Sequence, residues 1–251
     1  MSDAQRFYDD LAPEYEAIFV DWDKGMRWQG ELIAGLLGPA PDPVLDVAAG
    51  MGTQALGLAL RGLKVRARDL SPALVERGRR QAERLGVAVA FEVADMRVAQ
   101  AADAGRYGTV IGFDNALVHL LTDRELGAAL GAARQALRPG GRFLTSLRDY
   151  DALVTDRPAL DPPRLLGSAP ARRLVLQVWT WAPDGKSYQL DHIVLREAPG
   201  GWQGHTRRTT CRALLRAQLE QAARAAGFTS LEWIPPERSG YYQPIFVAGL
   251  A

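Results

Sequence analysis

The feature that most constrains the fold is an alternation of short apolar runs with helix-patterned stretches, which extends from Pro43 to Asp149. Parallel strands are buried on both faces and joined by crossover helices, so this alternation predicts a doubly wound α/β sheet. The cap residues Ser71 and Thr122 predict helices over 71–85 and 122–137. The predicted strands are 43–50, 63–70, 88–95, 108–115 and 141–149.

The pattern changes after Tyr150. Three prolines within 158–163 indicate a loop, and two runs with period-two alternation, 172–181 and 187–197, flank a Pro-Asp-Gly turn at 183–185. This arrangement predicts an antiparallel hairpin inserted after the fifth strand. The remaining predicted elements are a helix over 212–226 and strands over 229–234 and 243–250.

Composition limits the classes of partner. With 251 residues, 47% of them hydrophobic, the chain is long enough for one large core. Its 30 basic and 29 acidic residues give a net charge of +1, so we expect a small-molecule partner, with neither a nucleic acid nor a membrane. A single cysteine, Cys211, fits a cytoplasmic setting and excludes a zinc site built from cysteines.

A glycine-rich turn follows the first predicted strand. Gly50 and Gly52 allow backbone to approach a ligand, although a tight turn alone could require both glycines. Asp69 ends the second strand, where a carboxylate can accept the two hydroxyls of an adenosine ribose. Asp46 adds a negative charge that would repel the pyrophosphate of NAD and attract the ammonium of S-adenosylmethionine.

The third predicted strand ends in Ala94-Asp95-Met96. The Asp95 carboxylate can accept a hydrogen bond from the exocyclic amine of adenine, while Met96 packs on the ring. A helix N-cap is an equally good explanation for this aspartate.

These motifs, in this order over Val44 to Asp149, resemble the class I S-adenosylmethionine-dependent methyltransferases. Four further segments resemble the glycine and sarcosine N-methyltransferases: FYDDLAPEYEAIFVDWD (7–23), FDNALVHL (113–120), SLRDYD (146–151) and GYYQPIFVA (240–248). The resemblance implies a Rossmann-like sheet of seven strands with an antiparallel last strand and no metal. It also implies a helical lid over 1–40, a cofactor core over 41–150, a substrate-side insertion over 151–210 and a closing segment over 211–251.

The resemblance also implies roles for individual residues. Arg148 would grip a substrate carboxylate and Asn115 would contact the substrate, but Arg148 could instead pair with Asp149 or Asp151 at the surface. His119 could be a general base or a structural histidine. The expected catalytic residues are Asn115, His119 and Tyr15, the substrate-binding residues are Asn115, Arg148 and Tyr242, and the cofactor-binding residues are Tyr8, Tyr15, Asp46, Ala48, Gly50, Gly52, Asp69, Leu70, Ala94, Asp95, Met96 and Phe113.

The resulting hypothesis is transfer of a methyl group from S-adenosylmethionine to the amine nitrogen of a small amino-acid-like molecule. O-methylation of a small acid or phenol remains open, as does a cofactor-binding protein without turnover. A nucleic-acid substrate is disfavoured because the turn at 114–117 reads Asp-Asn-Ala-Leu and lacks the Pro-Pro-aromatic clamp used on a flipped base.

Overall fold

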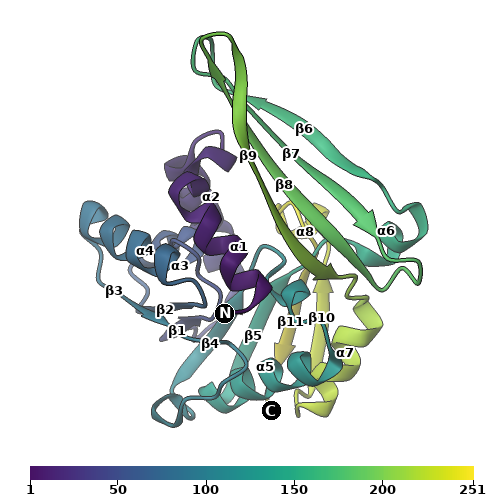
Figure 1. Cartoon of the computed structure of the whole chain (residues 1–251). Coiled ribbons are helices and arrows are strands. Elements are labelled where there is room, and N and C mark those ends of the chain that lie inside the picture. Colours follow the sequence, from purple (N-terminus) through teal and green to yellow (C-terminus); the bar gives the residue numbers. More distant parts are fainter.

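A computed structural model describes all residues, 1–251, and contains a mixed sheet of seven strands (Figure 1). Its order is β10-β11-β5-β4-β1-β2-β3, and only β11 runs antiparallel to its neighbours. The predicted doubly wound sheet with an antiparallel last strand is therefore confirmed. Its strands are β1 (Val44–Asp46), β2 (Val65–Asp69), β3 (Val89–Val93), β4 (Tyr107–Gly112), β5 (Leu137–Ser146), β10 (Ser230–Ile234) and β11 (Ile245–Gly249).

The crossover helices begin where the cap residues predicted. Ser71 accepts the Leu74 N–H and starts α4 (Pro72–Leu85), and Thr122 forms a capping box with Glu125 at the start of α5 (Asp123–Ala136). The helix expected over 212–226 is shorter, because Arg212 belongs to a strand and α7 spans Arg216–Ala225.

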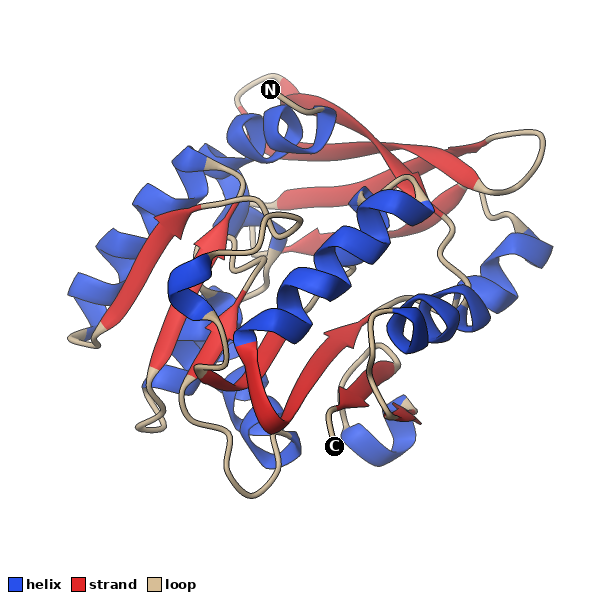
Figure 2. Ribbon diagram, turned by 90° about the horizontal axis from the view of Figure 1, so that it is seen from below, coloured by secondary structure: helices blue, strands red, loops and turns tan.

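Helices cover both faces of the sheet (Figure 2). On one face, α5 and α7 pack on β4 and β5 around Leu130, Phe143 and Phe246. On the other face, α2 (Trp22–Leu36), α3 (Thr53–Ala59) and α4 pack around Met26 and Leu56. Strands β1 and β4, in the middle of the sheet, are therefore buried along their whole length, which explains their apolar runs, whereas the edge strand β3 stays partly exposed.

The insertion after β5 is larger than the predicted hairpin. It begins with α6 (Tyr150–Asp156) and forms a four-stranded antiparallel sheet in the order β6-β7-β8-β9, which stands over one end of the core sheet (Figure 1). The hairpin itself, β7 (Arg173–Trp181) and β8 (Ser187–Ala198), is confirmed. The two additional strands are β6 (Leu160–Leu166) and β9 (Gly201–Arg212).

The loop expected around the three prolines is only partly correct: Pro158 lies between α6 and β6, but Pro162 and Pro163 lie inside β6. Proline has no N–H to donate, and it is tolerated here because β6 is an edge strand. The register also shifts between Asp161 and Arg164, so the pairing with β7 requires no hydrogen-bond donor from either proline. Strand β9 escaped prediction because residues 201–206 are all exposed and show no apolar alternation.

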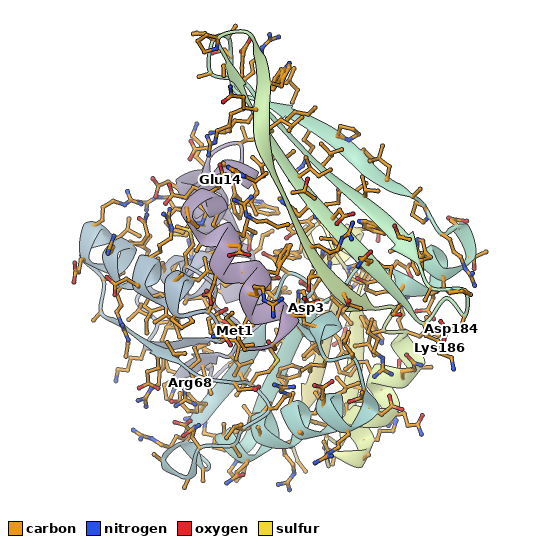
Figure 3. All side chains as sticks on the ribbon, in the orientation of Figure 1. Met1, Asp3, Glu14, Arg68, Asp184 and Lys186 are labelled. Carbon is orange, nitrogen blue, oxygen red and sulfur yellow. The ribbon has the colours of Figure 1, made fainter.

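The N-terminal segment forms a lid from α1 (Asp3–Leu11) and the 3-10 helix η1 (Ala12–Ile18), whereas α2 packs against α3 in the core layer. The lid expected over 1–40 is therefore shorter, because the second half of that range belongs to the core. It is tied to β9, since Asp3 accepts the Thr210 N–H at 3.0 Å and Arg207 donates to the Asp10 carbonyl at 2.7 Å and to Glu14 at 2.8 Å. Figure 3 labels Asp3 and Glu14 on this segment. The lid thus joins the core to the four-stranded sheet. None of the helices is both long and apolar enough to cross a membrane.

Candidate active site

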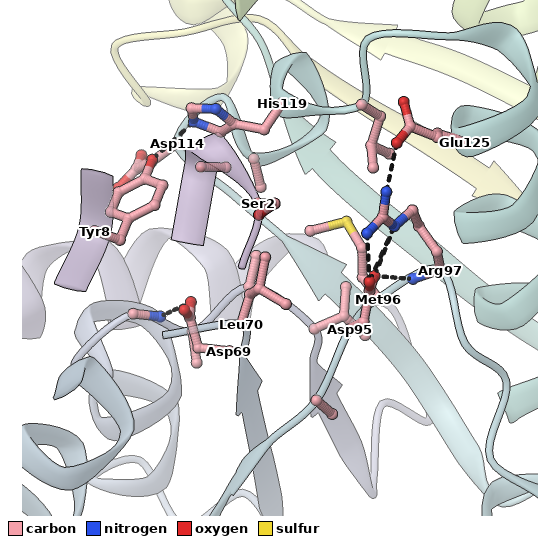
Figure 4. A pocket seen from close by; sticks show the side chains of 18 of the residues that line it. Ser2, Tyr8, Asp69, Leu70, Asp95, Met96, Arg97, Asp114, His119 and Glu125 are labelled. Atoms are coloured by element: carbon pink, nitrogen blue, oxygen red, sulfur yellow. Dashed lines mark hydrogen bonds and ion pairs between the residues drawn. The ribbon is translucent and has the colours of Figure 1, made fainter. Parts of the chain in front are cut away.

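Two hollows meet at the carboxyl edge of the core sheet. The first lies over the ends of β1 to β4 and beneath α1, which is where open α/β sheets bind their ligands (Figure 4). The second lies between the core, the lid and the four-stranded sheet. Ten of the twelve expected cofactor-binding residues line the first hollow: Tyr8, Tyr15, Ala48, Gly50, Asp69, Leu70, Ala94, Asp95, Met96 and Phe113.

The turn after β1 uses its two glycines differently. Gly50 has a φ of 55° and lines the first hollow, where an added Cβ would lie 3.4 Å from the Tyr15 hydroxyl. Gly52 has a φ of 99° and does not line it, because it caps α3 and its Cβ would lie 2.7 Å from the Phe91 ring. Only Gly50 is therefore placed to let a ligand approach the backbone.

Asp46 is buried behind this turn and does not line the first hollow. One carboxyl oxygen accepts the Ala48 N–H at 3.2 Å, while the other is buried without a partner. Burial raises the pKa of Asp46 to about 8, because the charged form loses its hydration there.

The Asp69 carboxylate organises the same turn. Its two oxygens accept the Gly50 N–H at 2.7 Å and the Ser71 N–H at 2.9 Å, so it links the ends of β1 and β2. Burial raises the pKa of Asp69, although both backbone bonds act in the opposite direction. Its oxygens still face the first hollow (Figure 4).

Asp95 closes a turn after β3 and caps no helix. It accepts the Arg97 N–H at 2.9 Å and pairs with the Arg97 guanidinium, which also contacts Glu125 (Figure 4). The Arg97 hydrogen bonds lower the pKa of Asp95, so this carboxylate is ionised at neutral pH. The N-cap explanation therefore does not apply.

The turn after β4 is held by the end of β5. Asp114 and Asn115 have left-handed φ values of 58° and 64°, which aspartate and asparagine tolerate better than most residues. The Asp114 N–H donates to the Ser146 hydroxyl at 2.8 Å, and the Asn115 side-chain oxygen accepts the Arg148 N–H at 2.8 Å. Asn115 thus fixes the backbone from which the Arg148 side chain extends.

Arg148, Asn115 and Tyr242 all line the second hollow. The Arg148 guanidinium lies 4.6 Å from the Trp179 ring centroid and donates to Gln177 at 3.1 and 3.2 Å. Asp149 and Asp151 pair with Arg216 instead, so they leave Arg148 facing the hollow with only Asp161, 3.9 Å away, as a carboxylate neighbour. The surface pair considered for Arg148 is absent.

The lid places Tyr8 and Tyr15 between the two hollows. The Tyr8 hydroxyl lies 3.0 Å from Nε2 of His119, whose Nδ1 is buried without a partner (Figure 4). Burial lowers the pKa of His119 to about 4, so the ring is neutral at pH 7. Only Tyr8, Tyr15 and Asp114 line both hollows.

Comparison with known proteins agrees with this geometry. Residues 44–141, from β1 into β5, match the family model of a methyltransferase domain. DesVI from Streptomyces venezuelae superposes with a TM-score of 0.77 over 96% of this chain and 98% of its own, at 19% identity, which shows the same fold. Residues 44–141 are thus similar to a methyltransferase domain, and the whole chain shares the fold of DesVI.

Two curated methyltransferases are similar over more than half of the chain. A glycine/sarcosine N-methyltransferase from Parasynechococcus marenigrum (strain WH8102) is 27% identical over 151 residues, which are 60% of this chain and 53% of the relative. A demethylmenaquinone methyltransferase from Thermus thermophilus is 32% identical over 143 residues, 55% of this chain and 62% of the relative. The chain thus spans little more than half the length of these relatives.

Several further groups at the site carry no recognisable signal in the sequence. The Gln54 amide donates to Asp114 at 2.9 Å and to Gln29 at 2.7 Å, and the Tyr241 hydroxyl also reaches Asp114. These side chains come from α3, α2 and the segment before β11, so no local pattern connects them. The Asp-Asn pair at 114 and 115, two residues that tolerate a left-handed turn, is the one signal that could have indicated this position.

Proposed function

We propose that this protein transfers a methyl group from S-adenosylmethionine to an amine nitrogen of a small molecule that also carries a carboxylate. The observation that carries this proposal is the junction of two hollows at Tyr8, Tyr15 and Asp114. A methyl donor in one hollow and an acceptor in the other would meet there and nowhere else.

The residues of the first hollow fit the cofactor. Asp69 can accept the ribose hydroxyls, and Asp95 with Met96 can hold the adenine. The buried Asp46 carboxyl, whose pKa is raised to about 8, has one oxygen without a partner behind the turn. An ammonium bound beside the turn would favour the ionised form of this carboxyl and attract it. When bound, the cofactor supplies a methyl group on a positively charged sulfur.

The second hollow fits an acceptor with a carboxylate. Arg148 faces it from the end of β5 with a single carboxylate neighbour, Asp161, 3.9 Å away, and a guanidinium can bind a carboxylate through two parallel hydrogen bonds. The stacked Trp179 ring and Gln177 hold the guanidinium in one orientation. The similarity to a protein named glycine/sarcosine N-methyltransferase supports this choice of acceptor.

The protein contributes by holding the reactants and excluding water. The lid covers the first hollow, and Tyr8 and Tyr15 would flank the point where the reactants meet without offering a strong nucleophile. Neutral His119 positions the Tyr8 hydroxyl through their hydrogen bond, which makes it a positioning residue. Asn115 positions Arg148 in the same way.

Two measurements test the proposal. Calorimetry should detect binding of S-adenosylmethionine and S-adenosylhomocysteine but not of NAD. Incubation with methyl-labelled S-adenosylmethionine and a panel of amino acids, amines without a carboxylate, carboxylic acids and phenols should label amino acids most. If only phenols or carboxylic acids were labelled, the methyl acceptor would be an oxygen atom and not an amine nitrogen. NAD binding without S-adenosylhomocysteine binding would refute the whole proposal.

A further inference from the structure

Asp114 is a carboxyl group without a cationic partner at the junction of the two hollows. It forms no ion pair with any Arg or Lys, and its hydrogen-bond donors are the neutral groups of Gln54, Tyr241 and Tyr242. An ionised carboxylate in a partly buried place is costly unless a positive charge compensates it. The chain provides no such charge beside Asp114, so a cationic ligand at the junction would stabilise the ionised form.

The three donors fix the carboxylate in place. Both tyrosine hydroxyls reach Oδ1 from the segment before β11, and the Gln54 amide reaches Oδ2 at 2.9 Å from α3. The Asp114 backbone is held as well, because its N–H donates to Ser146. Such a carboxylate is preorganised, and binding a cation would require little rearrangement.

We propose that Asp114 binds the protonated amine of the methyl acceptor and takes its proton before methyl transfer. This inference rests on the proposed function, which places the reacting nitrogen at the junction. Arg148 and Asp114 would then bind the two ends of one zwitterionic acceptor. Asn115, which lies next to Asp114 in the chain and binds the Arg148 backbone, sets their separation.

The proton balance of the reaction assigns a specific task to this carboxylate. An aliphatic amine enters as an ammonium ion, which has no lone pair, so one proton must leave before attack. Asp114 accepts that proton, the freed lone pair forms the N–C bond, and the C–S bond breaks with its electron pair remaining on sulfur. The proton then passes to solvent through the second hollow, and the carboxylate is restored.

The surroundings of Asp114 favour this task. Burial raises the pKa of Asp114, which makes it a better proton acceptor than an exposed carboxylate, while the hydrogen bonds from Tyr241 and Tyr242 limit that rise. His119 is less suited to the task, because burial lowers the pKa of its ring to about 4 and its Nε2 contacts Tyr8.

A binding experiment tests the inference without an identified acceptor. Sinefungin carries a protonated amine in place of the sulfonium methyl, so its ammonium marks the point of transfer, whereas S-adenosylhomocysteine has no charge there. Calorimetry on the full chain should give wild-type protein a clear preference for sinefungin. Asparagine tolerates the same left-handed φ, so Asp114→Asn should keep the turn. This variant should reduce the preference for sinefungin by about 10- to 100-fold, while its affinity for S-adenosylhomocysteine should change little.

Asp69→Asn is the matched control, because it removes a carboxylate of the same hollow that would contact the ribose common to both ligands. It should weaken both ligands together. A preference unchanged within about twofold in Asp114→Asn would overturn the inference. So would a wild-type protein without any preference for sinefungin, a result that needs no variant to fold. If neither ligand binds wild-type protein, the proposed function itself fails.

Discussion

The backbone N–H of Arg148 donates a 2.8 Å hydrogen bond to the side-chain oxygen of Asn115. This bond joins the ends of β4 and β5, two neighbouring parallel strands. It places the Arg148 guanidinium in the second hollow. Asp114, which precedes Asn115 in the chain, lies at the junction of the second hollow with the first hollow. The relative position of the two proposed acceptor contacts is therefore set by one side chain.

Arg148→Lys should already damage methyl transfer, because a point charge cannot reproduce the two parallel bonds and the stacking of a guanidinium on Trp179. With an acceptor identified, we expect a loss of about 2 to 4 kcal/mol in transition-state stabilisation, measured from kcat/KM. Cofactor affinity should stay unchanged. Arg208→Ala, which removes an exposed pair with Asp191, is the control, and an equally small loss in both variants would refute the role of Arg148.

Asp69→Ala should weaken S-adenosylhomocysteine binding by about 2 to 4 kcal/mol, because charge-assisted bonds to the ribose are lost. It should also lower the free energy of unfolding by about 1 to 3 kcal/mol, since the N–H groups of Gly50 and Ser71 lose their acceptors. Calorimetry and urea unfolding measure the two effects separately. Undiminished affinity in a correctly folded variant would exclude a ribose contact.

Gly52→Ala should destabilise the fold by about 2 to 4 kcal/mol, because a left-handed alanine is strained and its Cβ would clash with Phe91 at 2.7 Å. Gly62→Ala separates the two causes, since Gly62 has a φ of 85° but open space around its Cβ. We expect Gly62→Ala to cost only about 1 to 2 kcal/mol in urea unfolding. Equal losses in the two variants would show that the Phe91 contact has no importance.

His119 should make stability depend on pH. Its pKa falls from 6.5 in the unfolded chain to about 4 in the fold, so the unfolded state binds the extra proton between these values. Above about pH 6.5 His119 therefore leaves the free energy of unfolding unchanged. As the pH falls from 6.5 toward 4, protonation of the unfolded chain lowers the free energy of unfolding. We expect wild-type protein to lose about 2 to 3 kcal/mol more than His119→Gln between pH 7 and pH 4.5.

Chemical unfolding at several pH values measures this difference. His205→Gln is the control, because the His205 side chain is exposed on β9, and it should lose as much stability as wild type over the same interval. If His119→Gln also follows the wild-type curve, the ring is not neutralised by burial.

Local signals in the sequence were sufficient for the core. Ser71 and Thr122 fix the starts of α4 and α5 through their own side chains, so a short window contains the information. Pro162 and Pro163 led to the wrong prediction of a loop at these positions. A strand can contain proline where its edge is unpaired, and which edges are paired is decided by the whole sheet. The four-stranded sheet was therefore only half predicted.

The site divides in the same way. Asp69 and Asp95 were predicted to lie together because the ends of parallel strands share one edge of a sheet. The surroundings of Asp114 combine Gln54 with Tyr241, side chains nearly two hundred positions apart, and only the folded chain brings them together. Gly52 illustrates the opposite error, since its expected ligand contact is replaced by a packing requirement against Phe91.

The lid is at once the roof of one hollow and a side wall of the other. Tyr8 and Tyr15 line both spaces, and Asp3 and Glu14 anchor the same segment to β9. A ligand leaving the first hollow past this segment must therefore disturb the second. Substitutions in α1 should therefore change the Michaelis constants of both reactants together. Steady-state kinetics of such variants will report on movement of the lid, a step on which both reactants depend.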